Sequence, residues 1–119
     1  MGRRDKRQPV PDRHRLYELA VQCPEADVEF FDRIYRERNG RLPELLREDF
    51  CGTASLAAEW VRTRPSNRAI GVDMDAEVLD WGQRHNIEPL GSQADRVELI
   101  HGDVRSIQDP PADVLAALN

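Results

Sequence analysis

The stretch LLREDFCGTASLAAEW, residues 45–60, decides the fold class. A short apolar run passes into three charged residues and a turn around Gly52, and an alanine-rich stretch of helical character follows directly. A strand that leads at once into a helix is the opening of a βα unit. Two carboxylates, Glu48 and Asp49, stand where the strand becomes the helix, and a function for the chain has to account for them.

The alternation of strands and helices continues to the end of the chain. Asp75 is suited to cap one of the helices, and Pro65 ends another. Strands that alternate with helices of this length pair in parallel through crossover connections, so we expect an α/β fold with a parallel sheet. The expected strands are 44–50, 68–73, 96–101 and 113–118, and the expected helices between them are 54–63 and 75–85.

The residues before this sheet form two further units. Residues 1–12 are predicted to be a flexible basic tail, and residues 13–43 a helical segment with one helix over 13–22 and a second over 24–39. Pro24 suits the first turn of the second helix, and Gly40 suits its end. The α/β domain then covers 44–119, which gives one domain with a helical preface.

Composition and charge exclude several classes of protein. The chain has 119 residues, a net charge of −5 and two cysteines, Cys23 and Cys51, without metal-ligand or redox spacing. Residues 1–15 carry six basic and two acidic side chains, so the body of the chain is strongly acidic and nucleic acid is an unfavourable partner. No metal is expected, no membrane span or signal peptide is recognisable, and a cytoplasmic location is expected.

An acidic residue follows each of the first three strands. Glu48 and Asp49 end the first, Asp73 ends the second and Asp103 follows the third, at intervals that suit successive βα units. Ligands of open parallel sheets bind beyond the carboxyl ends of the strands. A phosphate-bearing ligand would be met by glycines and basic groups there, whereas S-adenosylmethionine offers two cations, a ribose diol and an adenine amino group, all of which carboxylates complement.

Three motifs carry a family resemblance. FCGTA, IGVDMD and HGDV resemble motifs I, II and III of the class I S-adenosylmethionine-dependent methyltransferases, and the resemblance covers about 44–119. It implies a Rossmann-like parallel sheet of the class I methyltransferase type, truncated after about four of the family's seven strands, so that the chain would be the N-terminal portion of such an enzyme. It also implies that residues 113–118 form an exposed apolar edge at which self-association could occur.

For motif I the resemblance implies that Glu48 lies near the methionine ammonium group, and that the backbone of Cys51, Gly52 and Thr53 runs beside the methionine part. The motif departs from the family pattern, because Phe50 and Ala54 replace the outer glycines. Neighbours on a strand point to opposite faces, so either Glu48 or Asp49 faces the cofactor while the other pairs with a basic group. Alternatively, Arg47 and the two acids form only a local ion-paired patch.

For motifs II and III the resemblance implies four further cofactor contacts. Asp73 would accept both ribose hydroxyls, and Met74 would lie along the adenine face. Asp103 would accept from the adenine amino group, and the Val104 backbone N–H would meet a ring nitrogen. No catalytic residue is assigned, although the helical segment could supply acceptor contacts from His14, Tyr17 or Tyr35.

Simpler roles are expected for other conspicuous side chains. Trp60 and Trp81 are expected to pack against the sheet. Cys51 has no neighbouring base and is not expected to be a nucleophile. Asn119, where the family's fourth motif begins, is expected to have no role.

The resulting hypothesis is S-adenosylmethionine-dependent methyl transfer to an unidentified acceptor, with weak or no activity from this portion alone. Two alternatives stay open. A Rossmann-like NAD-binding oxidoreductase also uses an acid after its second strand, but it needs a G-x-G-x-x-G turn that is absent here. A non-catalytic, methyltransferase-like binding module would keep the half-sheet without the reaction.

Overall fold

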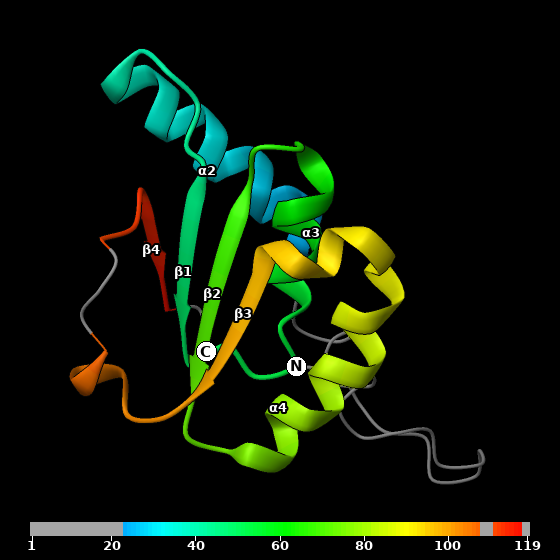
Figure 1. Ribbon diagram of the computed structural model, residues 1–119. Helices are drawn as coiled ribbons and strands as arrows, with labels where there is room; N and C mark the ends of the chain where they lie inside the picture. Colours follow the sequence, from blue (N-terminus) through cyan, green and yellow to red (C-terminus); the bar gives the residue numbers. More distant parts are fainter. Residues whose placement is uncertain (1–22, 108–110, 118–119) are drawn as a thin grey trace, which may run out of the picture.

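The computed structural model describes residues 23–107 and 111–117, which form one parallel sheet with helices beside it (Figure 1). The helix expected over 13–22 and the residues His14, Tyr17 and Asn119 lie outside the described residues. The elements are α2 Pro24–Asn39, β1 Leu45–Asp49, α3 Ser55–Thr63, β2 Arg68–Asp73, α4 Ala76–Gly82, η1 Gln83–Ile87, η2 Glu88–Arg96, β3 Val97–His101, η3 Val104–Ser106 and β4 Val114–Ala116.

The four strands are all parallel and lie in the order β3-β2-β1-β4. The connection from β3 to β4 crosses over β2 and β1, which places β4 at the edge of the sheet next to β1 (Figure 1). The α/β, Rossmann-like class and the four strands are therefore confirmed. Leu115 of β4 is 65% exposed, so an apolar side chain does stand at this edge as expected.

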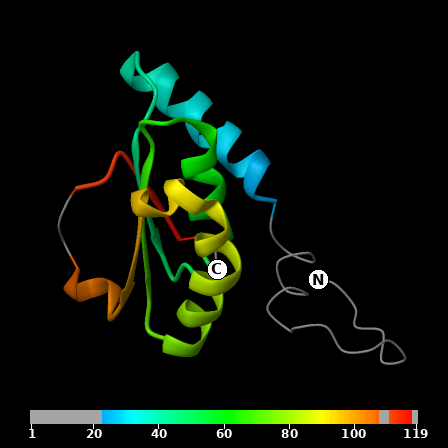
Figure 2. The same cartoon turned by 45° about the vertical axis from the view of Figure 1, so that its right-hand side comes forward.

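The helices α2, α3 and α4 cover one face of the sheet (Figure 2). The core between them contains Leu46 of β1, Ala69 of β2 and Ala116 of β4, together with the fully buried Trp60 of α3. The Trp60 indole N–H also donates to the Glu44 carbonyl, which satisfies its one polar atom. Trp81 of α4 is buried as well and stacks on the His85 ring, with 4.1 Å between the ring centroids.

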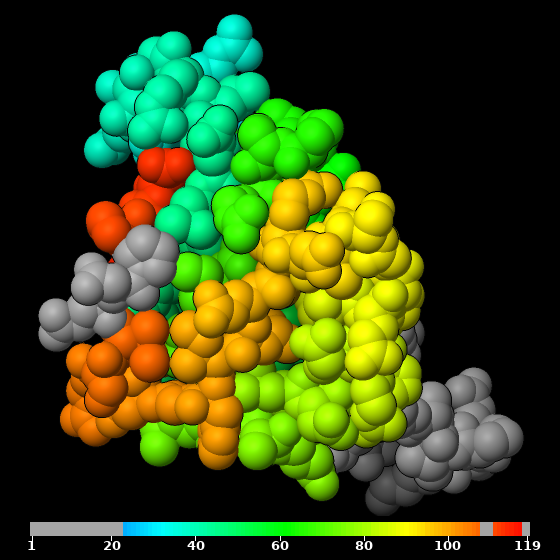
Figure 3. Space-filling view, viewed as in Figure 1, coloured from blue at the N-terminus to red at the C-terminus, as the bar shows by residue number. Residues whose placement is uncertain are grey.

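The opposite face of the sheet carries η3 and no α-helix among the described residues (Figure 2). Arg47 projects from β1 on this face, and its guanidinium donates to the backbone carbonyls of Val104 and Ile107. In the space-filling view of Figure 3, atoms of β1 and β2 are visible on this face beside β4. Through these two hydrogen bonds Arg47, a residue in the middle of β1, holds the segment after β3 against the sheet.

The second helix begins and ends as the sequence predicts. Pro24 is its first residue, and Gly40 adopts φ +73°, at which its N–H donates to the Arg36 carbonyl. A bidentate ion pair between Arg64 and Asp32 fastens this helix to the end of α3. Because the contact is partly buried and bidentate, it fixes the orientation of α2 on the sheet.

The expected helix over 75–85 differs from the observed one at its end. Asp75 caps it by accepting from the backbone N–H groups of Glu77 and Val78, but α4 ends at Gly82. The chain then continues through the π-helix η1 and the 3-10 segment η2, which is interrupted at Gly91 with φ +67°. No helix of the described residues is long and apolar enough to cross a membrane.

Candidate cofactor site at the carboxyl ends of the strands

Glu48 and Asp49 point to opposite faces of the sheet. Asp49 accepts from the Arg47 guanidinium at 2.7 Å on the face that carries η3. Glu48 projects into the interior on the helix-covered face and is 3% exposed. The expected division is therefore present: Asp49 forms the local ion pair, and Glu48 is the acid on the side of the helices and of Asp73.

The turn after β1 keeps a glycine-like backbone, although only one of the three glycines of the family pattern is present. Phe50, Gly52 and Ala54 have φ angles of +58°, +58° and +65°. Left-handed backbone of this kind costs a residue with a Cβ about 1–2 kcal/mol. The three positions at which the family pattern has glycine thus all adopt the conformation that glycine favours, although two of them hold other residues.

Contacts with the next strand hold this turn in place. The Cys51 N–H donates to the Val72 carbonyl at 3.0 Å, and the Gly52 N–H donates to Asp73 Oδ2 at 2.9 Å. The Cys51 side chain is buried against Gly71, where a Cβ at position 71 would stand 2.8 Å from the sulfur atom. The absence of a side chain at Gly71 therefore leaves space for the Cys51 side chain, and the buried Cys51 anchors the turn to β2.

The helix α4 supports the turn from the other side. Gly82 lies so close to Thr53 that a Cβ at position 82 would be 2.4 Å from the Thr53 carbonyl oxygen. The same oxygen accepts from the Asn86 side-chain amide at 2.8 Å. Thr53 is thus buried in the packing between the turn and α4.

Asp73 lies at the end of β2, and its carboxylate has hydrogen-bond acceptor positions that the protein does not use. Its two carboxylate oxygens accept from the backbone N–H groups of Gly52 and Asp75, both at 2.9 Å. An ionised carboxylate has about four lone-pair sites, so two remain for a ligand. Met74 follows and is 64% exposed, and its carbonyl lies 2.9 Å from His101 Nε2 of β3.

Asp103 and Val104 follow β3 and lie beside the same strand ends. The Gly102 N–H donates to the Asp73 carbonyl, which joins the exits of β2 and β3. Asp103 is engaged by Arg105, whose Nη2 lies 2.6 Å from Oδ2, and this contact lowers the pKa of Asp103 to about 2. A ligand that binds Asp103 would share this carboxylate with an arginine that is itself 86% exposed.

Glu48 differs from the other acids of the site in having a strongly raised pKa. Burial, with additional repulsion from Asp27 of α2 and from Asp73, raises the pKa of Glu48 to about 8. Among the described residues, its Oε1 atom is buried and has no hydrogen-bond partner. A buried acceptor without a donor is costly in a folded protein. A cationic or hydrogen-bond-donating ligand would remove that cost.

Cys51 supplies the thiol at this end of the sheet. Burial and the neighbouring carboxylates, Glu48 foremost, raise the pKa of the Cys51 thiol, so Cys51 is not activated as a nucleophile. The described residues also contain no group of three or more His, Cys, Asp or Glu side chains arranged to hold a metal ion.

A separate hollow lies at the opposite end of the strands. A cavity of about 290 Å³ is lined there by residues that include Leu45, Arg68, Ile70 and Glu98. Tyr35 also lies at this amino end, where its hydroxyl donates to Asp113 just before β4. Tyr35 therefore lies at the amino ends of the strands, away from Glu48 and Asp73, and its role in acceptor binding stays a prediction.

Several residues that shape the site carry no signal in the sequence. Asp27 acts on Glu48 from a helix 21 positions earlier, and Asn86 reaches Thr53 from 33 positions later. Arg47 reads as a strand residue but binds the segment after β3. Only tertiary structure brings these residues to the site. The pairing of Arg105 with Asp103 is different, because the two residues are only two positions apart and a contact between them could have been predicted from the sequence.

Comparison with known proteins identifies the fold. No protein-family model matches the chain, and no curated protein matches it by sequence. Among solved structures, the plantazolicin methyltransferase BpumL, in complex with S-adenosylhomocysteine, matches with a TM-score of 0.68 and 16% identity over 85% of this chain and 38% of that one. An RNA methyltransferase from Salinibacter ruber matches with a TM-score of 0.63 and 20% identity over 82% of this chain and 60% of that one.

The sugar N-methyltransferase KedS8 from Streptoalloteichus sp matches the whole chain with a TM-score of 0.66, at 19% identity and over 45% of its own length. The chain thus spans about two to three fifths of the structures that it matches. At these identities the match concerns the fold and not the activity. The structure has the fold of the N-terminal, Rossmann-like part of class I S-adenosylmethionine-dependent methyltransferases.

Proposed function

We propose that this chain binds S-adenosylmethionine and forms the cofactor-binding part of a methyltransferase with an unidentified acceptor. The observation that carries the proposal is the buried Glu48 carboxyl group with its unpartnered oxygen, at the exit of a central parallel strand and within the electrostatic reach of Asp73. A cationic ligand at this exit would give the Glu48 carboxylate the positively charged partner that it lacks. The similar structures crystallised with S-adenosylhomocysteine add support from the fold.

The residues present fit such a cofactor by their chemistry. Glu48 would hold the ammonium group, Asp73 would accept the ribose hydroxyls with its remaining lone pairs, and Met74 offers an exposed apolar surface for the adenine ring. The glycine-like turn at Cys51, Gly52 and Thr53 would let the backbone approach the methionine part closely. Asp103 and the Val104 N–H would complete the contacts to adenine.

The contribution of the protein to methyl transfer is mainly positional. When bound, the cofactor supplies an electrophilic methyl group on a sulfonium cation. Positioning the acceptor in line with that group can account for much of the rate enhancement, so a dedicated general base is not required at the strand ends. The acidic side chains of the site would also favour binding of the cofactor with its positively charged sulfonium group over binding of an uncharged form.

Isothermal titration calorimetry with S-adenosylmethionine, S-adenosylhomocysteine and NAD tests the proposal directly. We expect binding of the first two ligands and none of NAD. Replacing Asp73 by alanine removes the acceptor for the ribose and should weaken binding by about 1–3 kcal/mol. The matched control is Asp80→Ala, because Asp80 is an exposed acid on α4 whose ion pair with Arg84 lies on the helix surface.

The outcomes separate the alternatives. Binding of NAD without S-adenosylmethionine would replace the proposal by a dinucleotide enzyme. Equal affinities for wild type and Asp73→Ala would exclude the proposed role of Asp73. Binding of S-adenosylmethionine without methyl transfer by a protein that includes the remainder of the fold would favour a binding module.

A further inference from the structure

His101, the last residue of β3, lies beside Asp73 on the helix-covered face of the sheet. The two residues are register partners in the parallel pair of β2 and β3, so their side chains leave the sheet on the same side. Leu99, two positions before His101, packs against the core on this face. Because β1 lies next to β2 and turns Glu48 to the same face, the ends of three adjacent strands carry Glu48, Asp73 and His101 in a row.

The imidazole of His101 reaches the turn that follows β2. Its Nε2 atom lies 2.9 Å from the Met74 carbonyl oxygen. A carbonyl oxygen only accepts hydrogen bonds, so Nε2 carries a proton and donates it to this bond. Because His101 is exposed and water competes for the same groups, the bond adds little to the stability of the fold. Its main effect is on the position of the turn.

Two hydrogen bonds from the end of β3 fix the backbone of this turn. The Gly102 N–H donates to the Asp73 carbonyl at 3.0 Å, and His101 donates to the next carbonyl, that of Met74. Within the turn, the Asp75 N–H donates to Asp73 Oδ1 at 2.9 Å. The backbone that carries Met74 is therefore anchored on both sides, although the Met74 side chain is 64% exposed.

We propose that His101 is a positioning residue for the adenine end of the cofactor, because it holds the Met74 backbone and so fixes the apolar surface that meets the ring. This inference rests on the proposed function, in which adenine lies along Met74. A methionine side chain has three rotatable bonds, and a loose backbone would add to the freedom that is lost on binding. Anchoring the backbone in advance lowers this entropic cost and strengthens binding.

Calorimetry with S-adenosylmethionine and S-adenosylhomocysteine, which share the adenosine half, tests the inference. His101→Leu keeps a side chain of similar reach but removes the donor, and we expect both affinities to fall by the same factor, about two- to tenfold. His101→Gln places an amide N–H near the position of Nε2 and should restore most of the affinity. The matched control is Thr63→Val, which removes a side-chain hydrogen bond of the same length to the Glu59 carbonyl on α3 and should leave both affinities unchanged.

A double-mutant cycle tests whether His101 acts through Met74. Met74→Ala removes the apolar surface, so His101→Leu should cause little further loss of affinity in that background. The melting temperature of His101→Leu should stay within about 2 °C of wild type, whereas a merely structural role would lower it and leave the cycle additive. Additive losses, unchanged affinities in His101→Leu or the absence of rescue by glutamine would overturn the inference.

Amide hydrogen exchange of the unliganded protein separates this inference from the proposed function. If His101 holds the turn, the Asp75 N–H should exchange about two- to tenfold faster in His101→Leu than in wild type, and at nearly the wild-type rate in His101→Gln. Unchanged exchange in a protein that binds S-adenosylmethionine would overturn the inference alone. If wild type binds neither ligand, the proposed function is rejected, and the role of His101 in binding is rejected with it.

Discussion

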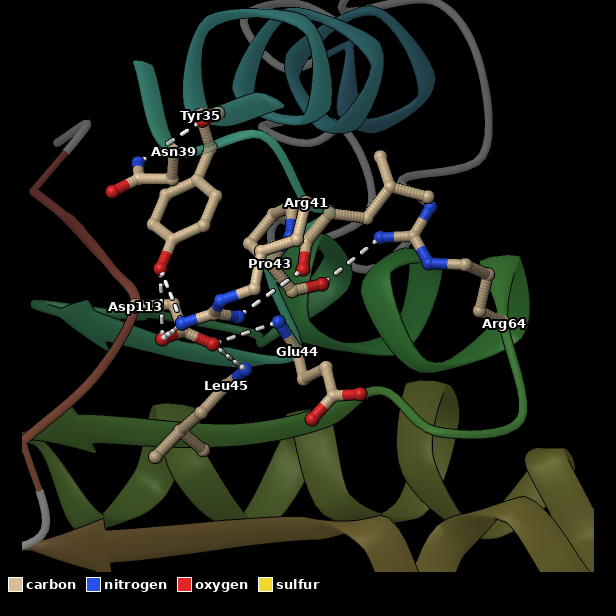
Figure 4. A network of polar contacts seen from close by, with 9 residues as sticks. Tyr35, Asn39, Arg41, Pro43, Glu44, Leu45, Arg64 and Asp113 are labelled. Carbon is tan, nitrogen blue, oxygen red and sulfur yellow. Dashed lines mark hydrogen bonds and ion pairs between the residues drawn. The ribbon is translucent and has the colours of Figure 1, made fainter. Parts of the chain in front are cut away.

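Two carboxyl groups at opposite ends of the sheet show how differently the same chemical group is treated in this fold. At the amino ends, Asp113 accepts from the backbone N–H groups of Glu44 and Leu45 and from the side chains of Tyr35 and Arg41 (Figure 4). At the carboxyl ends, Glu48 is buried, and no described donor reaches its Oε1 atom.

The electrostatics of the two acids differ accordingly. Partial burial raises the pKa of Asp113, but the backbone donors at Glu44 and Leu45 and the side chains of Arg41 and Tyr35 outweigh this effect, so its pKa is lowered overall. Burial and neighbouring acids raise the pKa of Glu48 to about 8. Asp113 is therefore a satisfied structural joint between α2, β1 and β4, whereas Glu48 has a buried oxygen atom without a partner among the described residues.

The largest expected effect comes from removing the charge of Glu48. Between about pH 4.5 and 8 the folded state holds a proton on Glu48 that the unfolded state has lost, so the free energy of unfolding should fall as pH rises through this range. The slope should approach about 1.4 kcal/mol per pH unit. Glu48→Gln should lack this slope and be more stable than wild type by several kcal/mol at pH 8, as chemical denaturation at a series of pH values would measure.

The control for this variant is Glu98→Gln, which alters an exposed acid on β3 and should keep the wild-type pH profile. Binding provides a second readout, because a cationic ligand prefers ionised Glu48. Affinity for S-adenosylmethionine should therefore rise with pH up to about 8 in wild type and be weak at every pH in Glu48→Gln. A pH-independent affinity in wild type would contradict the proposed contact.

A smaller effect is expected from disturbing the contact between α4 and the turn after β1. In Gly82→Ala the new Cβ would stand 2.4 Å from the Thr53 carbonyl oxygen, and backbone atoms cannot move aside cheaply. We expect a loss of stability of about 3 kcal/mol, measured by urea denaturation, together with weaker cofactor binding. The control is Gly102→Ala, where the nearest atom is Ile107 Cδ1 at an ordinary 3.7 Å; equal losses in both variants would refute the steric explanation.

The smallest effect on stability is expected at the satisfied acid. Asp113→Ala leaves two backbone N–H groups without their acceptor and should cost about 2 kcal/mol. Because the pKa of Asp113 is lowered, this deficit should be complete above about pH 4 and should shrink as the pH falls below it. Calorimetry should show unchanged affinity for S-adenosylmethionine, since Asp113 lies at the far end of the sheet. A large loss of binding would show that the two ends are coupled.

The difference between the two acids also explains how far the site could be predicted. Asp73 and Glu48 were accessible to sequence reasoning because they end apolar runs at regular intervals, and parallel strands bring such ends together. Asp113 stands before the fourth strand in the same kind of pattern, but its function depends on partners such as Tyr35, 78 positions away. Its role as a joint therefore had no local signal.

The sequence by itself determined the class of the fold, the four strands, both ends of α2 and the capped start of α4, because these follow from short-range periodicity and from residues such as Pro24, Gly40 and Asp75. It also determined that acids would gather at the strand exits. The extension of α4 through η1 and η2 to Arg96 was not predictable, since its π and 3-10 turns depend on packing rather than on period.

Only the tertiary structure decided which acid turns inward and what surrounds it. Alternation along β1 required Glu48 and Asp49 to diverge, but the choice between them depended on Arg47 and on the segment after β3 that it holds. The left-handed backbone at Phe50 and Ala54 was likewise hidden, because the contacts that enforce it come from β2 and α4. Burial and long-range contacts set these properties, and neither can be read from neighbours in the chain.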